Sequence, residues 1–184
     1  MFRHVIAAAA LVCLLPLGLV LAQEKSVMVG GAAMYPSKNI IENALNSSDH
    51  TTLVAAVKAA GLVETLQGKG PFTVFAPVNA AFEKLPAGTV DTLLMPANQK
   101  MLQSVLTYHV VAGAMDSKAL MAAAKKNGGS IELKTVAGAP LWVKLDGMKL
   151  WLEDGKGMKA AITTADVYQS NGVIHVIDTV VMAK

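Results

Sequence analysis

The sequence predicts one α+β domain, in which a helix-rich first half packs on a twisted β-sheet, or β-wedge, formed mainly by the second half. A change of period indicates this fold class. Up to about residue 126, apolar residues recur at helical spacing, whereas from Ser130 onward they alternate with polar residues, as at Ile131, Leu133 and Thr135. Helices segregated from strands are typical of one sheet covered on one side by helices.

A secretory signal is expected at residues 1–22, ahead of the domain. Arg3 gives it a basic start, an apolar run follows, and Ala22 ends a stretch suited to cleavage. An uncleaved membrane anchor is the alternative, but Pro16 interrupts an apolar stretch that barely reaches the ~20 residues of a membrane span. The sequence therefore predicts a secreted or periplasmic protein with no stable membrane span after cleavage. Cys13, the only cysteine, leaves with the signal, so the mature chain cannot use disulfides.

Residues 23–36 are expected to form a flexible lead, and the domain itself is expected over residues 37–184. Ser37 or Asn39 is suited to cap the first helix. Helical periodicity, together with flanking polar, glycine and proline residues, predicts the helices of the domain. They cover residues 39–45, 51–60, 62–67, 80–85, 89–94, 97–107 and 117–126, the last of them capped by Asp116.

Residues 70–82 combine a turn, a strand and a helix start. Gly70-Pro71 opens the segment, and residues 72–75 are aromatic or β-branched, which favours a buried strand. Pro77 ends the strand because it has no N–H to donate, and Asn79 is suited to cap the next helix. Nothing in this segment is a nucleophile, a metal ligand or a phosphate cradle, so we expect it to hold the fold together.

Further strands are expected at the period-two segments that follow. They cover residues 108–111, 131–135, 141–145, 148–152, 160–164 and 173–182. Asp146-Gly147 is expected to supply both central residues of a two-residue hairpin turn. Counting back from this turn places Trp142 opposite Trp151 and Lys144 opposite Lys149, with all four side chains on one face. Two interpretations of the tryptophan pair stay open: a stabilising cross-strand contact, or a surface platform for a ligand or partner.

Three segments together resemble the fasciclin domain family. They are residues 72–82, the Tyr108-His109 pair after a helical stretch, and residues 171–182, in the family's order and spacing. The segment that leads into the domain, residues 34–39, is similar to that of single-domain bacterial members. The resemblance implies a single fasciclin domain whose first and last signature strands meet in the core. It gives structural-motif positions at Phe72, Phe75, Pro77, Asn79, Phe82, Asn171, Gly172, His175 and Asp178.

The resemblance also makes Tyr108 and His109 candidate adhesion residues. In animal matrix proteins of the family, the corresponding region is implicated in cell adhesion through integrins. Core packing is the competing interpretation, and the loss of a buried motif would affect adhesion only through loss of the fold. Because the family packs the first signature close to the Tyr-His region, a polar link from Asn79 or its backbone to His109 is also expected.

Metal, nucleic-acid and enzyme functions find little support. His50 is expected to be exposed, while His109 and His175 lie in apolar segments and are expected to be hydrogen-bonded structural residues, too far apart in sequence to suggest a zinc site. Arg3 is the only arginine among 16 basic residues, so the mature chain sets 15 lysines against 13 acidic residues, which is too even for a nucleic-acid binder. The GxGxxA match at 155–160 does not open a helix. We expect no enzyme, no cofactor and no metal.

The favoured interpretation is an exported, non-catalytic binding module that mediates cell-surface or extracellular-matrix adhesion through protein–protein contacts. Its partner would be a cell-surface or matrix protein or a glycan. Self-association stays open, because nine of the ten methionines lie beyond Met1 and offer adaptable contacts. The alternative is a carrier or sensor of a small apolar or carbohydrate molecule, bound on the hairpin face of Trp142 and Trp151.

Overall fold

The computed structural model describes residues 25–183, and the predicted signal at residues 1–22 lies outside this range. The helices are α1 (Ile40–Ala44), α2 (Thr51–Ala60), α3 (Val63–Gln67), α4 (Asn79–Glu83), α5 (Thr89–Leu94), α6 (Gln99–Tyr108) and α7 (Ser117–Lys126), with short 3-10 turns η1 (Ser48–His50) and η2 (Pro96–Asn98). The strands are β1 (Val27–Val29), β2 (Ala32–Met34), β3 (Phe72–Pro77), β4 (Val110–Ala112), β5 (Ser130–Lys134), β6 (Pro140–Asp146), β7 (Lys149–Glu153), β8 (Lys159–Gln169) and β9 (Gly172–Ile177).

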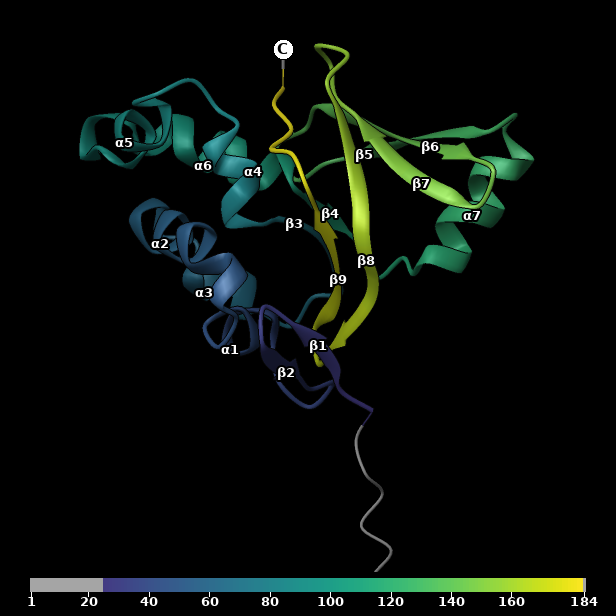
Figure 1. Ribbon diagram of the computed structural model, residues 1–184, viewed down its shortest axis with the longest axis horizontal. Coiled ribbons are helices and arrows are strands. Elements are labelled where there is room, and N and C mark those ends of the chain that lie inside the picture. Colours follow the sequence, from purple (N-terminus) through teal and green to yellow (C-terminus); the bar gives the residue numbers. More distant parts are fainter. Residues whose placement is uncertain (1–24, 184) are drawn as a thin grey trace, which may run out of the picture.

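Seven strands form one sheet in the order β4-β3-β9-β8-β7-β6-β5 (Figure 1). The last strand, β9, lies between β3 and β8. It runs parallel to β3, with Phe72 opposite Gly172 and Pro77 opposite Ile177, whereas the other neighbours in the sheet are antiparallel. The expectation that the two signature strands meet in the core is thereby confirmed.

The two ends of this sheet approach each other. Val111 of β4 forms a bridge with Thr135, just after β5. Beside it, the N–H of Val136 donates to the carbonyl of Val110 at 2.7 Å. The sheet is therefore a wedge that nearly closes into a barrel, with an inner side and an outer side.

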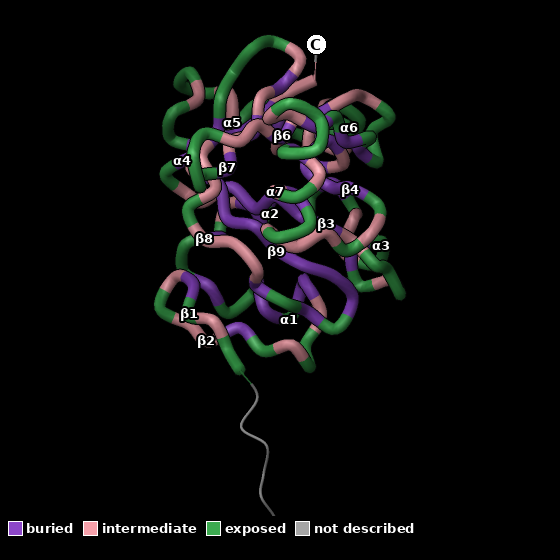
Figure 2. The backbone as a smooth tube through the Cα atoms, turned by 90° about the vertical axis from the view of Figure 1, so that its right-hand side faces the viewer, coloured by how far each residue is buried: buried purple, intermediate pink, exposed green. Residues whose placement is uncertain are grey.

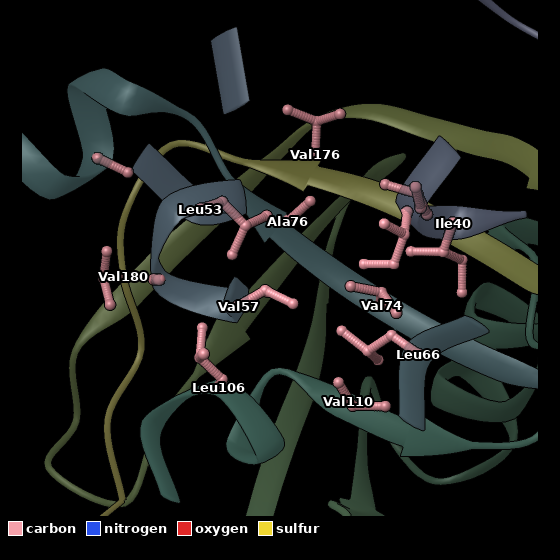
Figure 3. Packing of buried hydrophobic residues seen from close by; sticks show 14 of the residues in the cluster. Ile40, Leu53, Val57, Leu66, Val74, Ala76, Leu106, Val110, Val176 and Val180 are labelled. Carbon is pink, nitrogen blue, oxygen red and sulfur yellow. The ribbon is translucent and has the colours of Figure 1, made fainter. Parts of the chain in front are cut away.

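Each side of β3 and β9 contributes to a separate apolar core. The outer core lies between these strands and helices α1–α6, where Leu53 of α2 lies beside Ala76 and Val57 points toward Val74 (Figure 3). The inner core fills the wedge with side chains from β3 and β5–β9. Figure 2 shows the buried residues concentrated along the central strands and the exposed residues in the loops at both ends.

Helix α7 corrects the expectation that helices cover only one side of the sheet. Its Leu120 and Ala124 are fully buried in the inner core, against β5 and β6. Figure 1 shows α7 beside these strands, far from the group formed by α1–α6. The curvature of the sheet produces this arrangement, because a wedge that nearly closes has an inner side that one helix can plug.

Three local expectations were wrong or inexact. The supposed flexible lead contains the β1–β2 hairpin, whose Val29 and Met34 are buried in the outer core. Tyr108 is the last residue of α6, and His109 caps that helix, so β4 begins only at Val110. Strand β8 is longer than expected and β9 shorter, and residues 178–183 continue without strand pairing. The caps of α1 by Asn39 and of α7 by Asp116 were correct.

Candidate binding surface

The Tyr108-His109 pair is inside the protein. Tyr108 has no exposed surface, and its hydroxyl donates to the carbonyl of Pro140 at 2.7 Å and accepts from the N–H of Gly155 at 3.3 Å. His109 is 3% exposed. Side chains in this position contribute to folding, and neither is available as a contact surface for a partner.

His109 ties the end of α6 to the C-terminal segment. Its Nδ1 lies 2.8 Å from the carbonyl of Val105, to which it donates, and its Nε2 accepts the N–H of Val181 at 3.2 Å. This pair of contacts requires the neutral ring with its proton on Nδ1. Burial favours the same form, since it lowers the pKa of His109 to about 4.

The expected link from Asn79 to His109 is wrong, and so is the expected cap on α4. Helix α4 begins at Asn79 itself and has no side-chain cap. The amide of Asn79 instead caps α2, because its Oδ1 accepts from the N–H of Thr52 at 3.0 Å and from the hydroxyl of Thr51 at 3.2 Å. Its Nδ2 donates to the carbonyl of Ser48 at 2.8 Å. Asn79 therefore joins two helices that are distant in sequence.

The C-terminal signature begins with a buried amide that joins three segments. The Oδ1 of Asn171 accepts from the N–H of Ile40 at 3.1 Å, and its Nδ2 donates to the carbonyls of Leu66 and Gly68 at 2.8 and 2.9 Å. The next residue, Gly172, meets β3 so closely that a Cβ atom there would lie 2.1 Å from the Phe72 carbonyl oxygen. The C-terminal signature therefore allows backbone segments to pack closely against each other.

The remaining signature residues also make contacts within the fold. The ring of His175 stacks on Phe75 with 5.7 Å between centroids, and its Nε2 donates to the carbonyl of Met115 at 2.8 Å. Burial lowers the pKa of His175. Asp178 accepts the N–H of Ala161 at 2.9 Å, and Phe82 is buried in the outer core.

His50 was expected to be exposed, but it is 1% exposed. Its Nδ1 lies 2.9 Å from the hydroxyl of Ser47, and burial lowers the pKa of the ring. The polar residues around it in the sequence suggested a solvent-facing helix start. In the structure η1 turns this side chain inward, so the three histidines of the described chain are all buried.

The β6–β7 hairpin has a different register from the expected one. Its central residues are Gly147 and Met148, because Asp146 pairs with Lys149. Gly147 has φ +59 and Met148 is not among the residues with positive φ, which suits a turn with glycine in its first central position. The expected pairing of Trp142 with Trp151 is therefore wrong, as is that of Lys144 with Lys149.

The faces of the hairpin were nevertheless predicted correctly, because the register differs by two residues and a strand repeats every two. Trp142 lies opposite Glu153, and Lys144 lies opposite Trp151. These side chains point outward, whereas alternate residues such as Leu152 are buried in the inner core. The neighbouring strands extend the outer face, since Glu132 of β5 lies opposite Trp142 and Lys159 of β8 lies opposite Glu153.

We call this surface the tryptophan face and define it by six residues. They are Glu132, Trp142, Lys144, Trp151, Glu153 and Lys159. Helices α1–α6 gather over β3 and β9, away from this face, and α7 packs on the inner side of the sheet (Figure 1). Both indoles are half-buried, so they are held in place and still present ring surface to solvent.

Charged groups separate the two indoles. Lys144 and Glu153 form an ion pair with 2.7 Å between Nζ and Oε1, along one diagonal of the four paired positions. The tryptophans occupy the other diagonal. An open hollow lined by Lys144, Trp151, Glu153 and Lys159 adjoins this pair. The Nε1 of Trp151 is buried and has no hydrogen-bond partner among the described residues.

Comparison with known proteins identifies the family. The family model for the fasciclin domain matches residues 48–183. This chain belongs to the fasciclin domain family. Protein sll1483 of Synechocystis is 48% identical to it over 159 residues, which cover 86% of this chain and 81% of that protein. The cell surface glycolipoprotein MPB83 of Mycobacterium bovis is 37% identical over 159 residues, covering 84% of this chain and 63% of MPB83.

A solved structure shows the same fold. It is the fasciclin domain pair of the insect cell adhesion molecule fasciclin I, with a TM-score of 0.70 over 85% of this chain and 57% of that chain. At 18% sequence identity, this likeness concerns the fold alone. Together with the paired signature strands, it confirms the single α+β fasciclin architecture that the motifs predicted.

Within residues 25–183, no group of three or more His, Cys, Asp or Glu side chains is placed to hold a metal ion. In the same part of the chain, no helix combines the length and the apolar character that crossing a membrane requires.

Three members of the tryptophan face were missed by sequence reasoning. Glu132, Glu153 and Lys159 join it only through the strand order and register. Alternation did signal the outward position of Glu132, since Ile131 and Leu133 on either side are buried. Its position beside Trp142 depends on the pairing of β5 with β6, which alternation leaves open.

Proposed function

We propose that the chain is an exported, non-catalytic binding module that attaches to a component of the cell surface or extracellular matrix. The observation that carries the proposal is the contrast between the two candidate sites. The Tyr108-His109 pair is buried and hydrogen-bonded, whereas Trp142 and Trp151 remain at an open sheet face. Attachment therefore takes place on the outer face of β5–β8.

Two further observations support this proposal. A relative and a structural neighbour act at cell surfaces or in adhesion: MPB83 is a cell surface glycolipoprotein, and fasciclin I is a cell adhesion molecule. The predicted signal at residues 1–22 supports export, so that the module would act outside the cytoplasm as a secreted or periplasmic protein.

A second candidate function is a carrier or sensor for a small apolar or carbohydrate molecule. The hollow beside Trp151 favours it, since an aromatic wall with a few convergent polar groups is typical of small-ligand sites. A carrier binds its ligand in a one-to-one complex in solution and does not need to attach to a cell or matrix surface. This difference separates the two functions experimentally.

The test is an attachment assay with protein that is exported through its own signal and then purified. Plates coated with this protein are incubated with the producing cells and, separately, with their extracellular matrix. We expect saturable attachment that soluble protein inhibits. Absence of attachment to both cells and matrix, by protein shown to be folded, would contradict the adhesion function.

A further inference from the structure

We infer that the tryptophan face binds a neutral glycan chain, with Trp142 and Trp151 as two separate stacking platforms. This inference rests on the proposed function, for which it names the chemical group recognised on the surface or matrix component. Four features of the face carry it: the spacing of the indoles, the alternating charges, the unpaired indole N–H and the rigid support beneath.

The two indoles are spaced to contact different units of one extended ligand. They occupy diagonal positions on neighbouring strands, where backbone positions are about 7–8 Å apart. The stacked ring pair found within the described residues is Phe75 with His175, so the indoles do not stack on each other. We expect the exposed part of each indole to pack against the C–H face of a separate sugar ring, as an aromatic side chain with a polar edge favours.

The charges around the indoles favour a ligand rich in hydroxyl groups and without charge of its own. Trp142 lies between Glu132 and Glu153, and Trp151 lies beside Lys144. A polyanion would meet the glutamates, and a polycation would meet the lysines. A hydroxyl group donates to a carboxylate and accepts from an ammonium group, so a neutral polyol complements both kinds of neighbour.

The indole N–H of Trp151 supports the same ligand chemistry. This donor is buried without an acceptor in the described part of the chain, which is an unfavourable state for a polar group. A glycan hydroxyl that enters the adjoining hollow supplies the missing oxygen. The side chains that line the hollow must shift to admit it, because Nε1 exposes no surface.

The platform is held rigidly from below. The residues that alternate with the tryptophans, Leu141, Val143 and Leu152, have no exposed surface and belong to the inner core. The ion pair between Lys144 and Glu153 joins the same two strands from above. The backbone beneath the indoles is thus preorganised, so that only the side chains around the hollow have to rearrange when a ligand binds.

The two tryptophans of the chain make the test direct, since both lie on this face and all tryptophan fluorescence reports on it. Purified protein is titrated with neutral glucan, galactan and mannan oligosaccharides, and in parallel with the polyanions alginate and dextran sulfate. We expect a saturable fluorescence change with at least one neutral chain and none with the polyanions. The affinity should change less than about twofold between about 50 and 500 mM NaCl, because no net charge is neutralised.

Variants locate the site. Trp142→Ala and Trp151→Ala should each weaken binding of the neutral oligosaccharide by about tenfold or more, measured by calorimetry. Tyr168→Ala is the matched control, because Tyr168 is an exposed aromatic residue at the far end of β8 and should leave binding unchanged. Thermal unfolding of each variant shows whether the fold is retained, and calorimetry detects binding without relying on the remaining indole.

Each remaining outcome overturns the inference and separates it from the proposed function. Binding that persists in both tryptophan variants, or that is confined to polyanions and falls with salt, excludes a neutral-glycan site on this face. Attachment to matrix that depends on the tryptophans, but is abolished by protease and accompanied by no glycan binding, excludes the glycan and leaves the adhesion function. Failure of both attachment and glycan binding excludes both.

Discussion

The Nε2 atom of His109 accepts a hydrogen bond from the N–H of Val181 at 3.2 Å, which fixes the segment after the last strand against the end of α6. Val181 is fully buried in the inner core, and its neighbour Val180 is buried in the outer core. This ring nitrogen, together with the carboxylate of Asp154 that accepts the N–H of Met182 at 2.9 Å, holds in place a segment that seals both cores. A second proton on His109 would set two N–H groups against each other and break this contact.

This contact predicts a loss of stability in mild acid. The pKa of His109 is about 4 in the folded protein, against about 6.5 when unfolded, so between these values the unfolded chain binds more protons. The contribution of His109 to the free energy of unfolding is complete above pH 6.5 and is lost as the pH falls toward 4. Urea unfolding between pH 7 and 4.5 should show a decline that is shallower in His109→Gln. An identical pH dependence in this variant would contradict the assignment.

We expect the loss of the Asn171 side chain to destabilise the fold strongly, because this side chain bonds three backbone groups. Asn171→Ala leaves the N–H of Ile40 and the carbonyls of Leu66 and Gly68 without this partner. We expect the free energy of unfolding to fall by about 2–4 kcal/mol, measured by urea denaturation. Asn127→Ala is the comparison, since that amide bonds one exposed carbonyl at the end of α7. Equal effects of the two substitutions would rule out the joining role of Asn171.

Gly172 predicts a steric effect on strand pairing. A Cβ atom at this position would lie 2.1 Å from the backbone oxygen of Phe72, so Gly172→Ala forces β3 and β9 apart. We expect destabilisation of about 3 kcal/mol or more. In Gly128→Ala the added Cβ meets open space and the cost comes only from φ +72, which is about 1–2 kcal/mol. Thermal unfolding of both variants checks this order, and the reverse order would contradict it.

At Tyr108 we expect a substitution to lower stability without affecting attachment to matrix. Tyr108→Phe removes the hydrogen bonds to Pro140 and Gly155 but keeps the buried ring, so we expect destabilisation of about 1 kcal/mol. Because the side chain has no exposed surface, the folded variant should attach to matrix as the wild type does. The attachment assay, performed below the unfolding temperature of the variant, decides the point. Loss of attachment by the fully folded variant would show instead that Tyr108 belongs to the contact surface.

The sequence-based predictions succeeded where short-range patterns decide the structure. Alternation correctly assigned the two faces of the hairpin, and the capping residues Asn39 and Asp116 were correct because a cap bonds a backbone N–H only three residues away. The resemblance supplied the pairing of β3 with β9, which no local pattern reveals. The overall α+β class followed from the change of period near Ser130.

The errors arose where two segments far apart in sequence share a residue. Asn79 has the chemistry of a cap, but the helix it caps is α2, whose Thr52 lies 27 residues earlier in the sequence. His50 lies in a polar stretch, yet the fold buries it. The hairpin register depended on whether Asp146 or Gly147 takes the first central position of the turn, and the positive φ of Gly147 decided it. The tryptophan face could be predicted only in part for the same reason, since Glu132 and Lys159 reach it from neighbouring strands.

The measurement that tests the central claim most directly compares attachment of two folded variants to the same matrix. One carries Trp142→Ala together with Trp151→Ala, which removes both platforms from the tryptophan face, and the other carries Tyr108→Phe in the buried pair. Our account predicts that the double variant loses attachment while retaining its fold, and that Tyr108→Phe attaches normally. Normal attachment by the double variant, with attachment lost in a folded Tyr108→Phe, would contradict it.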